Sequence, residues 1–554
     1  MSITKSFLRL ALLGACFGAL PFAATAAPKT ICTITVNSPD EQAVFRRNLP
    51  PGDYRFVELV ERGRKDWLRS ACEQKVQCDS LIISGHFDDG DEFYTDRFDV
   101  SEYLTVLEME RASCSDSCPG VFSQLKEVYL FGCNTLKTEP RQVAGGEITR
   151  ALLRAGQSPA EAAKLSALLG EKHARSNRDR MRHIFKDVPV IYGFSSKAPL
   201  GKYAGPLLEK YFQTAPAGEV GSGQVSQKLL QLFGPSSMTV TTGLRDSEMQ
   251  ASARVDACRF VDDRVSPTQK VDFVHQMLKR DMSEVRMFIG DLERFTSSFP
   301  LAQRLQPEIA SGFNAIAGDQ ATRERYLTFA RDADEPAIRT RMMALATKLG
   351  WLTPAQEQAE FVRMIAERMA RDSVGMEEVN LACARGGDGE RDPTVQPLVG
   401  GALRYAKVGP AAALACLGSA QARARVVKAV TSDDTDEITI ARAYLRQRPL
   451  ADASEVRAVA TAIGRMPASG AQVRAIETLA QQRVSDPESL REIARLFPQA
   501  KSLQVQRAIA ALLIRADHRV LGQGELSRSL KQHRLKSPDG DDVIDALIRV
   551  LQAG

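Results

Sequence analysis

The sequence has few of the residues and none of the short motifs on which many enzymes depend. Of its 554 residues only six are histidine and two are tryptophan, and aromatic residues make up 6%. It contains no H-E-x-x-H, G-x-S-x-G or Walker A pattern, so no motif predicts a zincin, an α/β-hydrolase or a P-loop protein. Cysteine and histidine do not occur in pairs with the spacing of a structural zinc site.

The chain also lacks a strong net charge. Its 73 Lys and Arg and 68 Asp and Glu give a formal net charge of +5 at pH 7, and the charges are interspersed. Nucleic-acid binding needs basic residues clustered on one face, so we predict no nucleic-acid partner. The acidic run Asp88 to Glu92 has oxygen ligands that suit Ca²⁺ but not the EF-hand spacing. We interpret it as a solvated loop and predict no cofactor.

The first 26 residues have the pattern of a secretory signal peptide. Lys5 and Arg9 precede the apolar stretch from Leu10 to Phe22, and Ala24-Thr25-Ala26 forms a cleavage site. The apolar stretch is short for a membrane span. We therefore expect a periplasmic or secreted protein whose mature chain has no transmembrane span. The alternative is a lipoprotein in which Cys16 becomes the lipidated first residue.

Export to an oxidising compartment makes disulfide bonds the expected state of most cysteines. Removal of Cys16 leaves nine of the ten cysteines, an odd number that predicts one free thiol. Sequence does not determine connectivity, but proximity suggests the pairs Cys72 with Cys78, Cys114 with Cys118, Cys383 with Cys416, and Cys32 with Cys258. This hypothesis leaves Cys133 unpaired. The alternative is that several of these cysteines are reduced and buried.

Residues 28–255 alternate between strand-like and helix-like segments. Capping boxes at Ser38 to Glu41 and at Ser158 to Glu161 predict two helix starts. Strands that alternate with helices imply crossover connections and a parallel sheet, so we predict an α/β domain. The expected strands are Ile31–Val36, Tyr54–Val60, Leu81–Ser84, Val128–Phe131 and Val188–Phe194.

Residues 260–554 carry no strand signal. Ser266, Thr353 and Asp486 each precede a proline, which is a typical helix start, and apolar residues recur at helical spacing. We predict an all-α domain that is weakly similar to HEAT-like repeats, with a plain helical bundle as the alternative. Stacked helices present extended surfaces, so this half would recruit a protein partner or substrate.

Two residues stand directly after predicted buried strands, His86 after Leu81–Gly85 and Cys133 after Val128–Gly132. Ligands of parallel sheets gather beyond the carboxyl ends of the strands, and neighbouring strands lie about 5 Å apart. We therefore predict that Cys133 is a nucleophile and His86 its general base or acid. The backbone N–H groups of Phe87 and Cys133 would stabilise the oxyanion. The alternative is a histidine that caps a strand and a cysteine that is a core thiol or half of a disulfide.

This order of residues resembles the caspase-like cysteine peptidases, which include caspases, legumains, gingipains and CHAT domains. The segment Leu130-Phe131-Gly132-Cys133-Asn134-Thr135 is similar to the cysteine motif of the CHAT type, and 190–196 with 204–212 is similar to its fifth strand and last helix. The resemblance covers about residues 28–215. It implies a caspase-like fold and hydrolysis of peptide bonds in protein substrates. Ser195, Ser196 and Lys197, at the carboxyl edge of the sheet, are the expected substrate contacts.

The chain departs from this family at one position. The family usually has glycine after the histidine, whereas this chain has Phe87. A bulky residue restricts the turn that would supply an oxyanion donor. The departure favours an alternative function, a catalytically inactive scaffold that binds a protein partner through its helical half.

Overall fold

A computed structural model describes residues 27–59, 67–87, 90–96, 102–140, 145–173, 175–215, 218–385, 395–400, 407–482, 484–516, 520–537 and 542–553. The expected signal peptide and Cys16 lie outside these ranges. The chain divides into two compact units, 1–143 with 171–266 and 144–170 with 267–554. Residues 144–170 therefore belong to the helical unit, although the sequence pattern placed them in the α/β domain.

The first unit contains a mostly parallel six-stranded sheet in the order β2-β1-β3-β7-β8-β9. Only the β8/β9 pair is antiparallel. The central strands β3, β7 and β8 are buried along their whole length, because both faces of the sheet are covered and each strand is a short apolar run. The strands are β1 Lys29–Thr35, β2 Tyr54–Glu58, β3 Ser80–Ser84, β7 Glu127–Phe131, β8 Val190–Phe194 and β9 Met238–Thr241.

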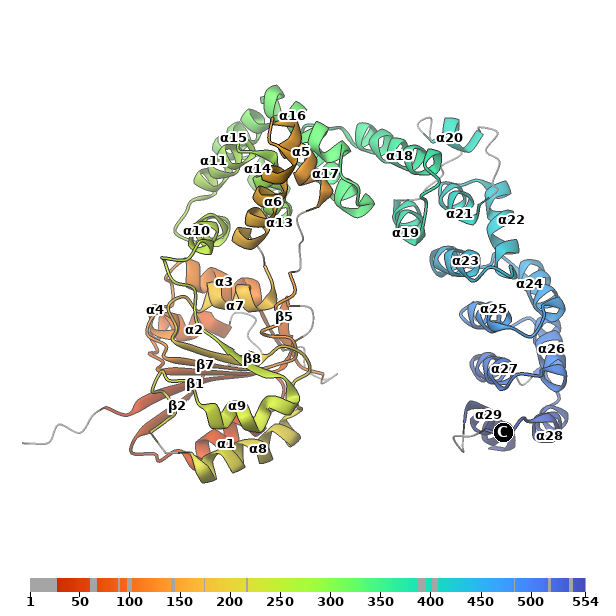
Figure 1. Ribbon diagram of the computed structural model, residues 1–554, viewed down its shortest axis with the longest axis horizontal. Coiled ribbons are helices and arrows are strands. Elements are labelled where there is room, and N and C mark those ends of the chain that lie inside the picture. The colour runs from red at the N-terminus through yellow and green to blue at the C-terminus, as the bar shows by residue number, and fades with distance from the viewer. Residues whose placement is uncertain are drawn as a thin grey trace, which may run out of the picture. The chain divides into compact units, whose positions relative to one another are not determined.

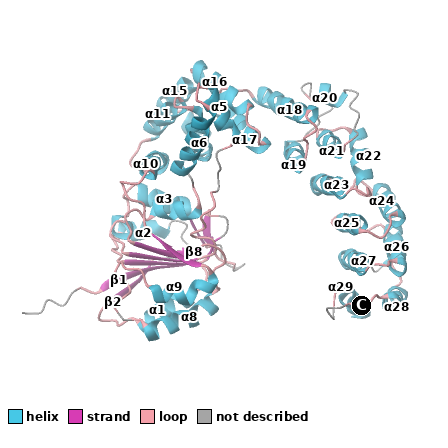
Figure 2. Cartoon of the chain, viewed as in Figure 1, coloured by secondary structure: helices cyan, strands magenta, loops and turns pink. Residues whose placement is uncertain are grey.

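Helices cover both faces of this sheet (Figures 1 and 2). One face packs against α1 (Asp40–Asn48), α8 (Gly201–Thr214) and α9 (Gln227–Phe233). The other face packs against α2 (Trp67–Glu73), α3 (Val106–Cys114), α4 (Pro119–Phe122) and α7 (Asn177–Ile184), and α10 (Gln250–Val261) contacts α3. This α/β arrangement agrees with the prediction.

A small antiparallel sheet, which the sequence did not predict, lies directly after β3. Its strands are β4 (His86–Phe87), β5 (Glu92–Tyr94) and β6 (Tyr103–Thr105). His86 pairs with Tyr94 and Phe87 pairs with Phe93. These strands are two or three residues long, too short for a periodic signal. They fix the backbone of His86 on a structured hairpin.

The disulfide bonds confirm one expected pair and correct three. Cys383 is bonded to Cys416 as expected. The hypothesis was wrong for the other six, which form Cys32–Cys78, Cys72–Cys118 and Cys114–Cys258. The reason is the packing: the β1/β3 register sets Cys32 beside Leu81, close to Cys78, α2 packs on α4, and α3 packs on α10. Four disulfides are consistent with an oxidising compartment.

The second unit is helical throughout its described residues. Its later helices form two rows, α23-α25-α27-α29 and α22-α24-α26, in which each helix packs on its neighbours in the same row (Figure 1). This arrangement is typical of helical repeats. The first of its helices are α5 Gly146–Arg154, α6 Pro159–His173, α11 Pro267–Leu278, α12 Met282–Met287, α13 Ile289–Ser298, α14 Leu301–Arg304, α15 Pro307–Gly318, α16 Gln320–Arg331, α17 Pro336–Lys348 and α18 Pro354–Ala370. The remaining ones are α19 Met376–Arg385, α20 Gln396–Gly400, α21 Val408–Cys416, α22 Ala420–Ala429, α23 Thr435–Gln447, α24 Ala453–Arg465, α25 Gly470–Ala480, α26 Pro487–Leu496, α27 Leu503–Arg515, α28 Gln523–His533 and α29 Val543–Ala553.

The helix starts that the sequence predicted in this unit occur where expected. Ser158 and Glu161 bond reciprocally at the start of α6, Thr353 caps α18, and Asp486 caps α26. Each satisfies backbone N–H groups that a helix N-terminus leaves unpaired. Across the described residues, no helix combines the length and the apolar character needed to span a membrane.

The helix α5 is joined to the rest of the second unit by a buried ion pair. Glu147 Oε1 accepts a hydrogen bond from Arg286 Nε at 3.0 Å, and both side chains are almost completely buried. Charges removed from water in this way are tolerated only when they are paired. This ion pair, together with the packing of α5 on α12, links residues 144–170 to the helical unit.

Candidate active site

The ends of β3 and β7 bring His86 and Cys133 to the same cavity. Ser84 and Phe131 are register partners on these adjacent parallel strands, and each is followed, two residues later, by one of the predicted catalytic residues. The cavity has a volume of about 40 Å³. Its other lining residues are Asn37, Ser38, Glu41, Ser84, Gly85, Phe131, Gly132, Ala198, Pro199, Leu200 and Gly201.

A tight turn after β7 holds Cys133 in place. Asn134 has a positive φ of 60°, and its N–H donates to the carbonyl of Ser196 at 2.7 Å. The Thr135 hydroxyl donates to the Gly132 carbonyl at 3.2 Å and accepts from the Phe194 N–H at 3.0 Å. Asparagine tolerates the left-handed conformation better than most residues. The turn therefore joins the loop that carries Cys133 to the end of β8.

Cys133 is half-buried and is the one free cysteine among the described residues. Its Sγ accepts a hydrogen bond from the Ala198 N–H at 3.3 Å. Within the described part of the chain, no hydrogen bond engages the backbone N–H of Cys133. That N–H is available to an oxyanion.

His86 lies at the edge of the cavity beside an acidic residue that the sequence analysis missed. Its Nε2 is 3.3 Å from Asp96 Oδ2, and the side chains are 25% and 67% exposed. The contact is an ion-pair distance, but the Nε2 atom makes no aligned hydrogen bond. No motif marks Asp96, which lies two residues after the end of β5 and comes close to His86 because Tyr94 of β5 pairs with His86.

Phe87 does not obstruct the site. Its side chain is 3% exposed, and its ring packs on the Phe93 ring at 4.6 Å between centroids. The φ angle of Phe87 is not positive. Its bulky side chain therefore causes no backbone strain at this position. Gly132 is required opposite it, since a Cβ there would come within 2.8 Å of the Phe87 Cβ.

Glu41 is a second residue of the cavity that the sequence analysis misread. The sequence predicts that it completes a capping box with Ser38, but α1 begins at Asp40 with Pro39 as its N-cap, and the Ser38 hydroxyl accepts from the Asp40 N–H at 3.2 Å rather than from the Glu41 N–H. The Glu41 side chain instead lines the cavity, is 3% exposed, and leaves its Oε2 without a hydrogen-bond partner.

Burial dominates the ionisation of Glu41. Loss of solvent raises its pKa to about 7, and the charge of Asp40 adds to this rise. The Glu41 backbone N–H and the nearby Ser84 hydroxyl oppose the increase. The carboxyl group therefore changes its protonation state near neutral pH, which is the range expected of an acid or base in a functional cavity.

The expected substrate contacts lie beside the cavity rather than in its wall. Ser195, Ser196 and Lys197 are exposed, and the N–H and hydroxyl of Ser195 both donate to the Ser237 carbonyl. The residues that follow them, 198–201, form the wall of the cavity.

The acidic run is only partly described, because Asp88 and Asp89 lie outside the described residues. Asp91 forms an ion pair with Arg180 at 3.3 Å. Within the described ranges, no group of three or more histidine, cysteine or acidic side chains is arranged to hold a metal ion.

Comparison with known proteins gave no assignment. No protein-family model, no curated protein and no solved structure matches this chain.

Proposed function

We propose that the first unit is a cysteine endopeptidase that hydrolyses peptide bonds in protein substrates outside the cytoplasm. The observation that supports this proposal best is that Cys133 and His86 line one cavity at the carboxyl ends of adjacent parallel strands. A free thiol beside a histidine is the pair that thiol-dependent acyl transfer requires. The sequence resemblance to caspase-like peptidases favours the same activity.

In this mechanism His86 accepts the proton of the Cys133 thiol, and the thiolate attacks the carbonyl carbon of the peptide bond. The backbone N–H of Cys133 donates to the oxyanion, with the Phe87 N–H as the second expected donor. The C–N bond then breaks as His86 gives its proton to the leaving amine. His86 then takes a proton from a water molecule as that water attacks the thioester carbon. The C–S bond breaks, the acid product leaves, and His86 returns the proton to the Cys133 sulfur.

Asp96 has a positioning role in this scheme. Its carboxylate, 3.3 Å from His86 Nε2, gains an ion pair only while the imidazole is protonated. The contact therefore stabilises the imidazolium that forms after proton transfer. Since Asp96 is exposed, solvent weakens this interaction and its contribution is modest.

The alternative function is a scaffold that binds a protein partner and has no catalytic activity. The observation that favours it is the double row of helices in the second unit, since stacked helices expose long surfaces to a partner. A cavity of only about 40 Å³ at the dyad also fits this reading.

The reactivity of Cys133 distinguishes the two functions. The oxidised mature chain is treated with iodoacetamide, and labelled peptides are located by mass spectrometry. An endopeptidase predicts rapid labelling confined to Cys133, slowed at least tenfold in His86→Ala. His533→Ala, at an exposed position on α28, is the matched control and should label like the parent chain. Labelling no faster than a model thiol, or labelling independent of His86, would favour the scaffold.

A further inference from the structure

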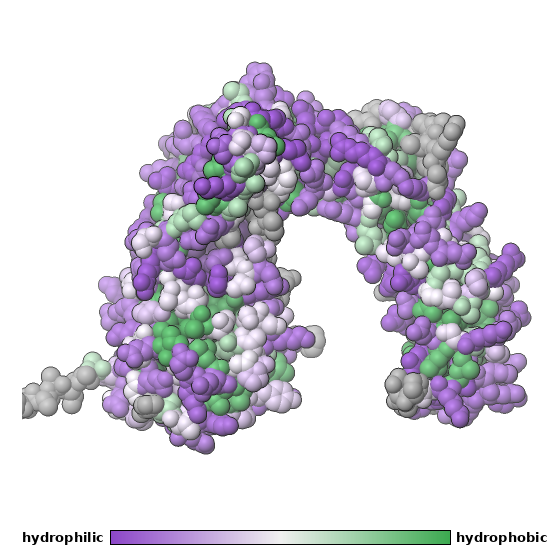
Figure 3. All heavy atoms as spheres, in the orientation of Figure 1, coloured by the Kyte–Doolittle hydropathy of each residue, from purple (hydrophilic) through white to green (hydrophobic). Residues whose placement is uncertain are grey.

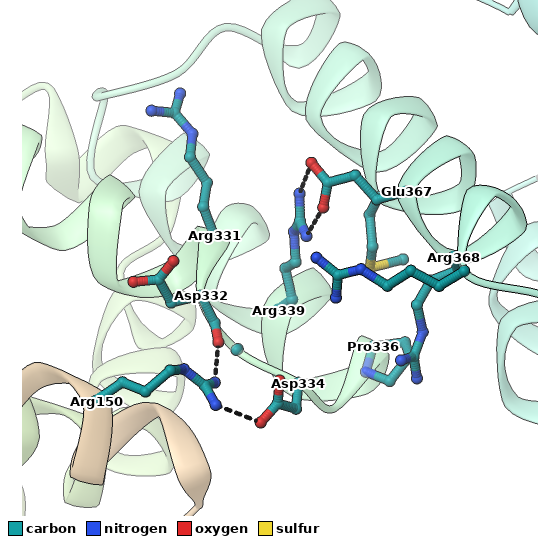
Figure 4. Close-up of a pocket in the computed structure, with 11 residues that line it drawn as sticks. Arg150, Arg331, Asp332, Asp334, Pro336, Arg339, Glu367 and Arg368 are labelled. Atoms are coloured by element: carbon teal, nitrogen blue, oxygen red, sulfur yellow. Dashed lines mark hydrogen bonds and ion pairs between the residues drawn. The ribbon is translucent and has the colours of Figure 1, made fainter. Parts of the chain in front are cut away.

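The second unit contains a cavity rich in arginine. It has a volume of about 290 Å³ and lies where α5 meets the ends of α16, α17 and α18 (Figure 4). Hydrophilic side chains predominate over α16 to α18 on the face drawn in Figure 3. The lining residues are Arg150, Arg331, Asp332, Ala333, Asp334, Pro336, Arg339, Met364, Glu367, Arg368 and Arg371.

Carboxylates and carbonyls position most of these arginines. Arg150 donates to Asp334 at 2.8 Å and to the Asp332 carbonyl, and Arg339 donates to both oxygens of Glu367 (Figure 4). Burial opposes ionisation of Glu367, but the hydrogen bond from Arg339 and the charges of Arg339, Arg363 and Arg371 together outweigh burial and keep its pKa below the usual value. The acid is thus a charged support for Arg339.

Two further arginines are held by acids that do not line the cavity. Arg331 turns outward to Glu360, to which its Nε donates at 3.1 Å. The Nε of Arg368 donates to Glu378 at 2.8 Å. Both guanidinium groups have nitrogen atoms beyond those used in these bonds, since each carries five N–H donors.

Positive charge exceeds negative charge at this cavity. The lining contains five arginines and three carboxylates. The excess of two remains when the ion-pair partners of the lining are included, because Arg154 and Arg363 join the cations and Glu360 and Glu378 join the acids. Such a concentration of fixed charge in a concave site attracts an anion.

Two arginines of the lining have side-chain N–H groups that no hydrogen bond engages within the described residues, although the charge of Arg371 acts on Glu367. Arg339 is 5% exposed, and its Nε is buried without a hydrogen bond. No ion pair or hydrogen bond engages the Arg371 side chain within the described part of the chain. A buried N–H that is left unpaired costs free energy, which a ligand oxygen would recover.

We propose that this cavity binds a doubly charged oxyanion, a phosphate group, between Arg339, Arg368 and Arg371. Planar guanidinium forks match the oxygens of a tetrahedral oxyanion and can donate to it in pairs. A charge of minus two balances the excess that the cavity carries. The ligand is either the free phosphate ion or a phosphate monoester. A monoester binds only if the cavity also has room for the organic group that is attached to the phosphate.

The test is isothermal titration of the mature full chain with inorganic phosphate at constant ionic strength, with chloride as the blank. Phosphate is expected to bind with a defined stoichiometry of one. Arg371→Gln should weaken binding at least tenfold, because it removes a charged donor. Arg465→Gln removes an exposed arginine from α24, outside this cavity, and should leave the affinity unchanged.

Four further outcomes decide the proposal and the source of the phosphate. Failure of both phosphate and O-phosphoserine to bind, or equal weakening by Arg371→Gln and Arg465→Gln, overturns it. Tighter binding of O-phosphoserine than of phosphate assigns a monoester, and exclusion of O-phosphoserine assigns the free ion. Since Arg371 is exposed, its substitution does not threaten folding, and circular dichroism of the variant checks this directly.

Discussion

Replacing Glu41 by glutamine is expected to stabilise the first unit at pH 8 and to leave its stability unchanged at pH 4. The carboxyl group is buried, and burial raises its pKa from an ordinary value of 4.5 to about 7. Below pH 4.5 the group is protonated in both the folded and the unfolded chain, so it costs nothing. Between pH 4.5 and 7 the unfolded chain ionises this carboxyl while the folded chain keeps its proton, so stability falls over that range and the loss is complete once the pH has risen through 7.

The size of the effect follows from the two pKa values. They differ by about 2.5 units, and each unit corresponds to about 1.4 kcal/mol. Glutamine carries no charge at any pH, so Glu41→Gln should gain about 3 kcal/mol above pH 7. The gain should grow from zero between pH 4.5 and 7. Because Glu41 is 3% exposed, solvent does little to reduce it.

Hydrogen exchange measured by mass spectrometry reports this change in the first unit alone. The exchange rates of amides in β1 and β3 are first corrected for their intrinsic rates. At pH 8 these amides should exchange about 300-fold more slowly in the variant than in the parent chain, since each pKa unit is a factor of ten. At pH 4 the variant and the parent chain should exchange at equal rates. Asp40→Asn removes an exposed neighbouring carboxylate and is expected to give only a small gain. Equal protection of Glu41→Gln and the parent at pH 8, or faster exchange in the variant, would refute the reasoning.

Three other substitutions test the structure. Thr135→Val removes the acceptor of the Phe194 N–H and should cost about 1–3 kcal/mol, seen as lost exchange protection at that amide. Arg286→Met leaves the buried carboxylate of Glu147 unpaired and should destabilise the second unit by about 3–5 kcal/mol; a denaturant midpoint equal to that of the parent would contradict the buried pair. Burial, with nearby arginines, lowers the pKa of His183 to about 3, so stability should fall by about 1.4 kcal/mol per pH unit as the pH drops from 6.5 toward 3. His183→Gln should flatten this dependence in a pH series of exchange measurements on α7.

Local patterns were sufficient to predict the central sheet. The strands β3, β7 and β8 lie where continuous apolar runs end in glycine or serine, because strands buried on both faces leave no choice of residue. The edge strand β9 and the small sheet around His86 were not predicted. These strands are short, and their residues are mixed in polarity. Their conformation depends on pairing with strands that lie elsewhere in the sequence.

Long-range pairing explains the other differences. Cys72 and Cys78 are close in sequence, but Cys72 lies on α2 and Cys78 lies just before β3, and each is bonded to a cysteine 46 residues away. No motif marks Asp96, and the motif that includes Glu41 predicts a helix cap rather than a cavity residue, because only the folded chain brings these two acids to the cavity of His86 and Cys133. Sequence therefore gave the two residues at the strand ends but not their acidic neighbours.

The buried pair between Glu147 and Arg286 has a consequence for how the protein can be divided and how it assembles. Since α5 and α6 leave the α/β unit and return to it, neither unit is a contiguous stretch of chain. A fragment ending at residue 266 would retain α5 with a carboxylate whose cation is missing. During synthesis α5 and α6 are made before the other helices of their unit, which begin at residue 267. The two helices can therefore complete their packing only after that later part of the chain has been made. Dissection by simple truncation should therefore yield an α/β fragment with an unfinished helical hairpin, and separating the units cleanly requires removing 144–170 and joining residue 143 to residue 171.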